Sequence, residues 1–168
     1  MFHKVVVALD RTESSSLVFE EAVSLAKATG AQLMLIHVLP PENVAGQQMS
    51  LYTEGYYLSL PQERLELFHR EWNEFKNWSL QHLQSDVDTA KAAGVSVDFS
   101  QAYGNPGKAI CEFAKNWDAD LILMGRRGHT GVNELLLGSV SNYVLHHASC
   151  AVLTLNPRSP ARSHAKAH

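Results

Sequence analysis

The sequence predicts an α/β protein built on a single open, doubly wound parallel sheet with helices on both faces. Five short apolar runs alternate along the chain with four segments of helical periodicity. The runs are continuously apolar, which is typical of strands buried on both faces of a sheet. The chain has 168 residues, of which 45% are hydrophobic and 18% charged, and this length and composition fit one globular domain.

The first predicted unit is a strand, a helix and a second strand. Residues 4–9 read KVVVAL and end at Asp10, and the hydroxyl-rich residues 12–15 that follow are typical of a helix start. The helix is expected to end at Gly30, because glycine readily adopts the left-handed conformation that stops a helix. Residues 32–38 (QLMLIHV) form the second strand, and a crossover of this kind is right-handed.

A long insertion separates this unit from the rest of the chain. Residues 42–61 contain two glycines and three tyrosines and are longer than the usual connection of roughly 2–6 residues. Such a segment is either a lid or a variable insertion, and the sequence leaves both alternatives open.

Residues 62–93 predict one long helix that extends beyond the sheet. Its apolar stripe could pack in a coiled coil, but a serine interrupts the stripe, so we expect the helix to pack on its own sheet. The stripe consists of Leu65, Phe68, Trp72, Phe75, Ser79, Leu83, Val87 and Ala90.

The second half of the chain repeats the alternation of strands and helices and ends in a polar tail. Residues 156–168 mix Pro, Arg, Ser and His without an apolar pattern, and we expect them to be disordered. The predicted domain therefore spans residues 1–155. Its remaining strands are expected at residues 95–99, 121–124 and 150–155, and its remaining helices at residues 105–117 and 138–147.

Charge and composition argue against several classes of protein. A net charge of −3 and a pI near 6.3 give no broad attraction for nucleic acid or for acidic lipids. No stretch approaches the roughly 20 apolar residues of a membrane span, and the apolar run near the start is too short for a signal peptide. Cys111 and Cys150 are expected to be buried free thiols. These features predict a cytoplasmic protein with no nucleic-acid or membrane partner.

The segment from Gly125 to Ser141 carries the strongest functional signal. It reads GRRGHTGVNELLLGSVS and follows a predicted strand, at the edge where parallel sheets bind ligands. Gly125 and Gly128 allow the backbone to approach a phosphate closely. Gly138 and Ser139 open the last helix, whose first N–H groups favour an anion. An isolated G-x-x-G would indicate only a tight turn, but the second Gly-Ser pair favours an anion site.

Other patterns in the chain do not indicate catalysis. Residues 103–109 superficially resemble a phosphate-binding loop, yet Ala102 and Ala109 replace the glycine and the hydroxyl residue that such a loop needs. Gly104 and Lys108 are therefore better explained by a turn and a helix cap, with contact to a ligand as the alternative. The sequence has no Ser-His-Asp or Cys-His arrangement of interpretable spacing and no paired carboxylates beside the glycine segment.

The spacing Gly-x2-Gly-x9-Gly-Ser resembles the nucleotide-binding signature of the ATP-binding branch of the universal stress protein family. Residues 4–41, which read KVVVALDRTESSSLVFEEAVSLAKATGAQLMLIHVLPP, are similar to the first strand, helix and second strand of that family. The resemblance covers residues 4–155 and is weakest across 42–94. Together with the alternation of elements, it implies a Rossmann-like sheet of strand order 3-2-1-4-5.

The resemblance also implies a set of nucleotide-binding residues. Asp10 matches an acidic residue near the ribose, and Mg²⁺ or Mn²⁺ would be shared between Asp10, phosphates and water. Val38 matches a position whose backbone contacts adenine. Arg11 and Arg127 differ from residues that are common in relatives, which leaves the number of phosphates open. The implied set is Ala8, Leu9, Asp10, Val38, Met124, Gly125, Arg127, Gly128, Gly138, Ser139, Val140 and Ser141.

We therefore expect a stress-response or regulatory protein that binds ATP, AMP or a related adenine nucleotide, with little or no hydrolysis. The alternatives are a nucleotide-free interaction adaptor, a sensor of AMP or a cyclic nucleotide, and an adenylate-transferring enzyme. The enzyme would need a second substrate pocket, for which the sequence offers residues 42–61. The resemblance also implies a homodimer through antiparallel pairing of the strand from Cys150 to Leu155, and it leaves any protein partner open.

Overall fold

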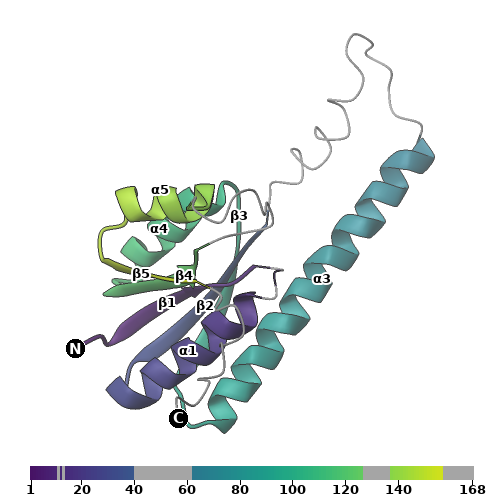
Figure 1. The fold of residues 1–168 in the computed structure, drawn as a ribbon. Helices are drawn as coiled ribbons and strands as arrows, with labels where there is room; N and C mark the ends of the chain where they lie inside the picture. The colour runs from purple at the N-terminus through teal and green to yellow at the C-terminus, as the bar shows by residue number, and fades with distance from the viewer. Residues whose placement is uncertain (11, 13, 40–61, 127–136, 157–168) are drawn as a thin grey trace, which may run out of the picture.

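The computed structural model describes residues 1–10, 12, 14–39, 62–126 and 137–156. Its strands form one five-stranded parallel sheet of order β3-β2-β1-β4-β5 (Figure 1), which confirms the predicted fold class and strand order. The predicted insertion, residues 42–61, and the predicted tail, apart from residue 156, lie outside the described residues. The elements are β1 (Lys4–Ala8), α1 (Ser14–Thr29), β2 (Gln32–Leu39), α3 (Gln62–Ala92), β3 (Val97–Tyr103), α4 (Pro106–Asn116), β4 (Leu121–Gly125), α5 (Ser139–His147) and β5 (Ala151–Leu155).

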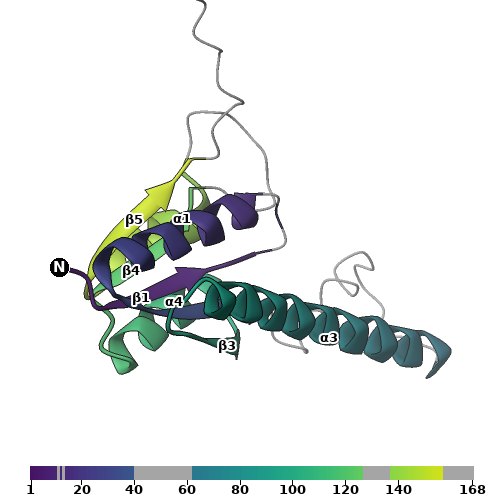
Figure 2. The same cartoon turned by 90° about the horizontal axis from the view of Figure 1, so that it is seen from below.

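Helices cover both faces of the sheet. In Figure 1, α1 and α3 lie on one face and α4 and α5 on the other, and in the view from below (Figure 2) α1 lies over β1 and β4. Successive strand residues point to opposite faces, so Val5 and Val7 pack toward α1 and α3 whereas Val6 packs toward α4 and α5. All three valines are fully buried. This burial explains why the strands read as continuous apolar runs rather than alternating ones.

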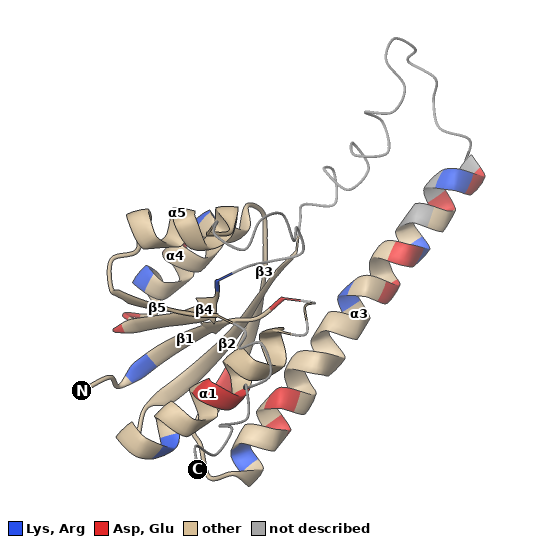
Figure 3. Ribbon diagram, viewed as in Figure 1, with Lys and Arg blue, Asp and Glu red and all other residues tan. Residues whose placement is uncertain are grey.

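The long helix α3 packs on the sheet through its middle and its carboxyl-terminal part. Leu83, Val87 and Ala90 belong to the core between the sheet, α1 and α3, as the stripe predicted. The amino-terminal part extends past the sheet, and charges of both signs follow it (Figures 1 and 3). The described side chains in that part include Trp72, which is buried, and the exposed Leu67.

The third strand differs from the sequence prediction. Residues 95–99 were expected, whereas β3 begins at Val97 and continues to Tyr103, pairing with β2 as far as Leu39. Val95 belongs instead to the stop of α3, because its N–H donates to the carbonyl of Ala90 (3.0 Å) beside Gly94, which has a φ of 81°. β3 is an edge strand, so the later part of the strand can be polar, and an apolar run underestimates its length.

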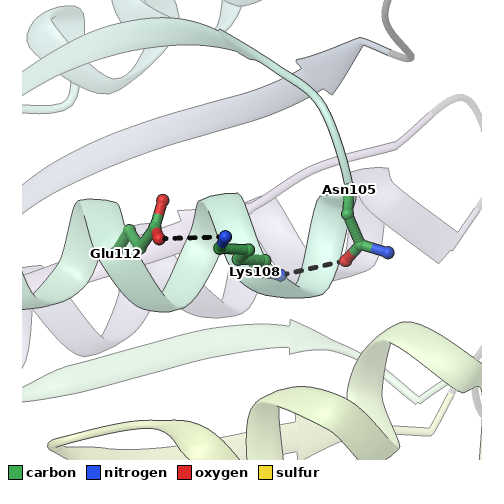
Figure 4. Close-up of polar contacts among 3 residues, drawn as sticks. All are labelled: Asn105, Lys108 and Glu112. Carbon is green, nitrogen blue, oxygen red and sulfur yellow. Dashed lines mark hydrogen bonds and ion pairs between the residues drawn. The ribbon is translucent and has the colours of Figure 1, made fainter.

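A side-chain cap starts α4, as expected for residues 103–109. The N–H of Lys108 donates to Oδ1 of Asn105 (3.1 Å), and Nζ of Lys108 pairs with Glu112 (3.8 Å) on the next turn (Figure 4). Gly104 precedes the cap with a φ of 120°, a conformation that favours glycine. The turn-and-cap interpretation is therefore confirmed for these residues.

The two cysteines are free and half-buried, beside the core under α4 and α5. Burial raises the pKa of both thiols, and the neighbouring Cys150 adds to the rise for Cys111. Both thiols therefore stay protonated at neutral pH.

None of the helices described here combines the length and the apolar character needed to cross a bilayer.

Candidate functional site

A cavity of about 230 Å³ lies at the carboxyl ends of β1 and β4. The chain runs outward from β1 to β2 and β3, then returns to β4 on the other side of β1, so this cavity is at the point where strand order reverses. Crevices at such points bind ligands in open α/β sheets. We call it the switch-point pocket. It is lined by Ala8, Leu9, Asp10, Ser14, Ser15, Val18, Ile110, Met124, Gly125, Gly138, Ser139, Val140 and Ser141.

Two helix amino termini meet at this pocket. Ser14 is the first residue of α1 and Ser139 the first residue of α5, and both line the cavity. The first N–H groups of a helix lack intrahelical acceptors and carry the positive end of the helix dipole. Gly138, the residue before α5, has no side chain to cap those groups. The arrangement therefore favours an anionic ligand.

Ser141 fixes the start of α5 against the end of β4. Its side chain is almost fully buried, and its Oγ lies 2.8 Å from the carbonyl oxygen of Arg126 and 3.0 Å from that of Gly138. The N–H of Gly138 also donates to the Arg126 carbonyl (3.0 Å). A hydroxyl has one proton, and this one is given to the backbone. Ser141 therefore holds the start of α5 against the end of β4, and its hydroxyl proton is engaged by the backbone of this chain.

Asp10 connects the end of β1 to the start of α1. Its Oδ1 accepts hydrogen bonds from the Thr12 N–H (2.9 Å), from the Thr12 hydroxyl and from Ser15 Oγ (2.8 Å). The N–H of Asp10 donates to the same Ser15 Oγ (2.8 Å). Oδ2 accepts no hydrogen bond from the part of the chain that the structure describes. One carboxylate oxygen thus holds the turn, and the other is available to a ligand.

The structure brings together most of the predicted site. Every predicted residue that is described lines the switch-point pocket except Val38, whose side chain packs beside the core under α4 and α5. The role predicted for Val38 rests on its backbone and stays a prediction. Arg127 and Gly128 lie outside the described residues.

Four residues of the pocket were not predicted as ligand contacts. Ser14 and Ser15 stood out only as helix-start residues, and Val18 and Ile110 lie within predicted helices without having been singled out. The hydroxyl-rich residues after Asp10 were the available signal for Ser14 and Ser15. That these residues lie beside the start of α5 follows from the strand order.

A second cavity of about 280 Å³ lies between α1, β2 and α3, and we call it the α1/α3 pocket. It shares Leu9, Asp10 and Ser15 with the switch-point pocket. Its remaining described lining consists of Thr12, Ser16, His37, Trp78, Ser79, His82, Leu83 and Asp86.

Asp86 is a residue of the α1/α3 pocket whose pKa is shifted by its surroundings. Burial raises the pKa of its carboxyl above the ordinary value of 3.8, and the nearby His82 opposes only part of that rise. The folded state therefore binds the Asp86 proton more tightly than the unfolded state. Ionised Asp86 destabilises the fold at neutral pH, and this penalty disappears as the pH falls below 3.8.

An Asp86→Asn variant should therefore melt at a higher temperature than the parent protein at pH 7. The difference in melting temperature between the variant and the parent should become smaller as the pH falls toward 3.8, because the parent carboxyl then becomes neutral as well. Asp88→Asn is the matched control, since Asp88 is exposed on the same helix and accepts a hydrogen bond from Gln84 (2.9 Å). Melting curves across this pH range test the prediction, and an equal rise in both variants would contradict it.

No group of three or more His, Cys, Asp or Glu side chains within the described ranges is placed to hold a metal ion. A cation at Asp10 would need most of its ligands from a bound phosphate and from water.

Comparisons with known proteins identify the family. The model of the universal stress protein family matches residues 1–156. Universal stress protein Sll1388 of Synechocystis sp. is 38% identical over 158 residues, covering 90% of this chain and 96% of that protein. Universal stress protein YxiE of Bacillus subtilis is 32% identical over 155 residues, covering 91% of this chain and 98% of that protein.

Solved structures show the same fold. Hypothetical protein MJ0577 superposes with a TM-score of 0.73 at 19% identity, covering 95% of this chain and 99% of that one. A universal stress protein in complex with cAMP has a TM-score of 0.59 at 24% identity, with 92% and 97% coverage. One from Archaeoglobus fulgidus in complex with dAMP has a TM-score of 0.57 at 19% identity, with 91% and 97% coverage. With the family model matching almost the whole chain, this protein belongs to the universal stress protein family.

Proposed function

We propose that this chain is a cytoplasmic regulatory protein of the stress response that binds ATP in the switch-point pocket. The observation that carries the proposal is the convergence of the α1 and α5 amino termini on a cavity at the strand reversal. These two helix ends attract phosphate. The apolar side of the same cavity, formed by Ala8, Val18, Ile110 and Met124, suits a base and ribose.

The related structures support an adenine nucleotide as the ligand class. One of them is described as a complex with cAMP and another as a complex with dAMP. ATP is preferred here because the glycine segment and the start of α5 offer more anion-binding backbone than a single phosphate requires. A Mg²⁺ or Mn²⁺ ion would be held by Oδ2 of Asp10 together with the phosphates, and it would neutralise their charge.

The lining of the pocket supports binding with little or no hydrolysis. Asp10 is the one ionisable side chain among its described lining residues, and its Oδ1 is already engaged by Thr12 and Ser15. A hydrolytic site usually positions a base for the attacking water in addition to the groups that hold the phosphates. Binding is therefore proposed as the function, and any turnover as slow.

The test is to denature purified protein and to identify the released small molecules by ion-pair chromatography with mass detection. We expect ATP at close to one molecule per chain. If the extract contains AMP or a cyclic nucleotide instead, that nucleotide takes the place of ATP as the proposed ligand. An empty extract, together with no calorimetric response to ATP and Mg²⁺, would overturn nucleotide binding and favour an interaction adaptor.

We also propose a homodimer formed by antiparallel pairing of β5. β5 is an edge strand of the sheet, and Leu153 on it is 44% exposed. An apolar edge strand is a template for pairing with a second chain.

A Leu153→Lys variant should be monomeric, because pairing would place two lysines in the interface. Leu67→Lys is the matched control, since Leu67 is 48% exposed on the part of α3 that lies away from β5 (Figure 1). Light scattering after size-exclusion chromatography gives the mass. A dimer that survives in Leu153→Lys would rule out this interface.

A further inference from the structure

The α1/α3 pocket has a wall chemistry that differs from that of the switch-point pocket. Its charged side chains are Asp10 and Asp86, and its described lining contains no lysine or arginine. Leu9, Leu83 and Trp78 add apolar surface. The cavity therefore combines an apolar side with carboxylates, and it repels anions such as a nucleotide phosphate.

No described residue donates a hydrogen bond to the carboxylate of Asp86. Its carboxylate is half-buried and accepts no hydrogen bond from the described residues, whereas Asp88 on the same helix accepts one from Gln84. A desolvated carboxylate without a donor is unfavourable unless a cation or donor reaches it. Burial raises the pKa of Asp86 for this reason. A ligand that brings positive charge to Asp86 would remove the penalty.

Hydrogen bonds and a ring contact fix several side chains in the rest of the wall. Nδ1 of His82 donates to the backbone carbonyl of Trp78 (3.0 Å). The same imidazole packs on the Trp78 indole, with ring centroids 3.9 Å apart. Deeper in the cavity, the buried His37 and Ser79 side chains are hydrogen-bonded to each other. The tilted contact between the His82 and Trp78 rings and the buried pair hold the wall in one arrangement, which favours a preformed site.

We propose that the α1/α3 pocket binds a small organic cation, a primary ammonium or guanidinium group on a compact apolar body, with the charge paired to Asp86. The ammonium or guanidinium supplies the donor that Asp86 lacks, and the apolar body contacts Leu9, Leu83 and Trp78. The site is built from described residues of α1, β2 and α3, so it does not require residues 42–61. The two pockets share Leu9, Asp10 and Ser15, but Asp86, which pairs with the cation, lines only the α1/α3 pocket.

The test uses three probes of matched shape, which are benzylamine, benzyl alcohol and benzoate, titrated calorimetrically into the full chain in phosphate buffer free of amines. Benzylguanidine serves as the guanidinium counterpart of benzylamine. We expect saturable binding of benzylamine or benzylguanidine at one per chain, affinity lower by about tenfold or more for benzyl alcohol, and no binding of benzoate. Equal affinity for benzylamine and benzyl alcohol, or no saturable binding of either cation, would overturn the proposal.

Two variants with the same change in net charge locate the site. Asp86→Asn should weaken benzylamine binding by about tenfold or more, because it removes the paired charge and keeps the shape. Asp88→Asn should leave the affinity unchanged. An equal loss in both variants would assign the effect to the general charge of α3 and overturn the assignment to this pocket. ATP titrations of the same variants report on the switch-point pocket separately, so failure of one proposal can be told from failure of the other.

Discussion

A Ser139→Glu variant should lose nucleotide affinity by roughly 100-fold or more while keeping its fold. Ser139 is the first residue of α5 and lines the switch-point pocket, so a carboxylate there would face the bound phosphates. The same carboxylate is favourable in the free protein, because a negative charge at a helix amino terminus stabilises the helix by about 0.3–1 kcal/mol. Calorimetric titration with ATP and Mg²⁺ gives the affinity, and a melting curve gives the stability.

Ser139→Gln is the matched control for this variant. Glutamine has nearly the same shape as glutamate but no charge, and Ser139 is exposed, so the side chain has room. We expect a loss of less than about tenfold for Ser139→Gln. If both variants lose affinity equally, the effect is steric and the phosphates do not lie at the start of α5. If neither loses affinity, the switch-point pocket is not the nucleotide site.

The sequence predicts a strand or helix correctly where its local pattern reflects its burial and position in the fold. The central strands are buried on both faces, so residues 4–9 and 121–124 read as apolar runs and lie within one residue of β1 and β4. Helix ends were predicted where glycine is required, as at Gly30, which has a φ of 74°. The edge strand β3 was misplaced because one side of it meets no other strand, and polar residues are tolerated there.

The candidate site was predictable where it depends on backbone geometry. Asp10, Gly138 and Ser139 lie at strand or helix ends, and parallel topology brings such ends to one edge of the sheet. The α1/α3 pocket could not be predicted in the same way. His37 is on β2 and Asp86 on α3, and no spacing in the sequence relates them. Their proximity depends on how α3 packs across the sheet.

The packing of α4 on α5 determines where the start of α5 lies, and it depends on a glycine. Gly107 is buried in the first turn of α4, and a Cβ atom at this position would lie 2.7 Å from Cδ1 and 2.9 Å from Cβ of Tyr143 on α5. The Tyr143 ring is itself stacked on His147, with centroids 4.0 Å apart, so it cannot easily turn away. Relief of the contact therefore requires the two helices to separate.

A Gly107→Ala variant should lower the free energy of unfolding by up to about 2 kcal/mol. Alanine in an ordinary helix is more favourable than glycine by about 1 kcal/mol, but the overpacking penalty of about 1–3 kcal/mol acts against it and should exceed it here, because the contact includes Cβ of Tyr143. Urea unfolding measures the change. Adding Tyr143→Ala should reduce the penalty in a double-mutant cycle, since the ring that resists separation is removed. A Gly107→Ala protein more stable than the parent would mean that α5 can shift without loss, and the start of α5 would then be a poor fixed point for a phosphate site.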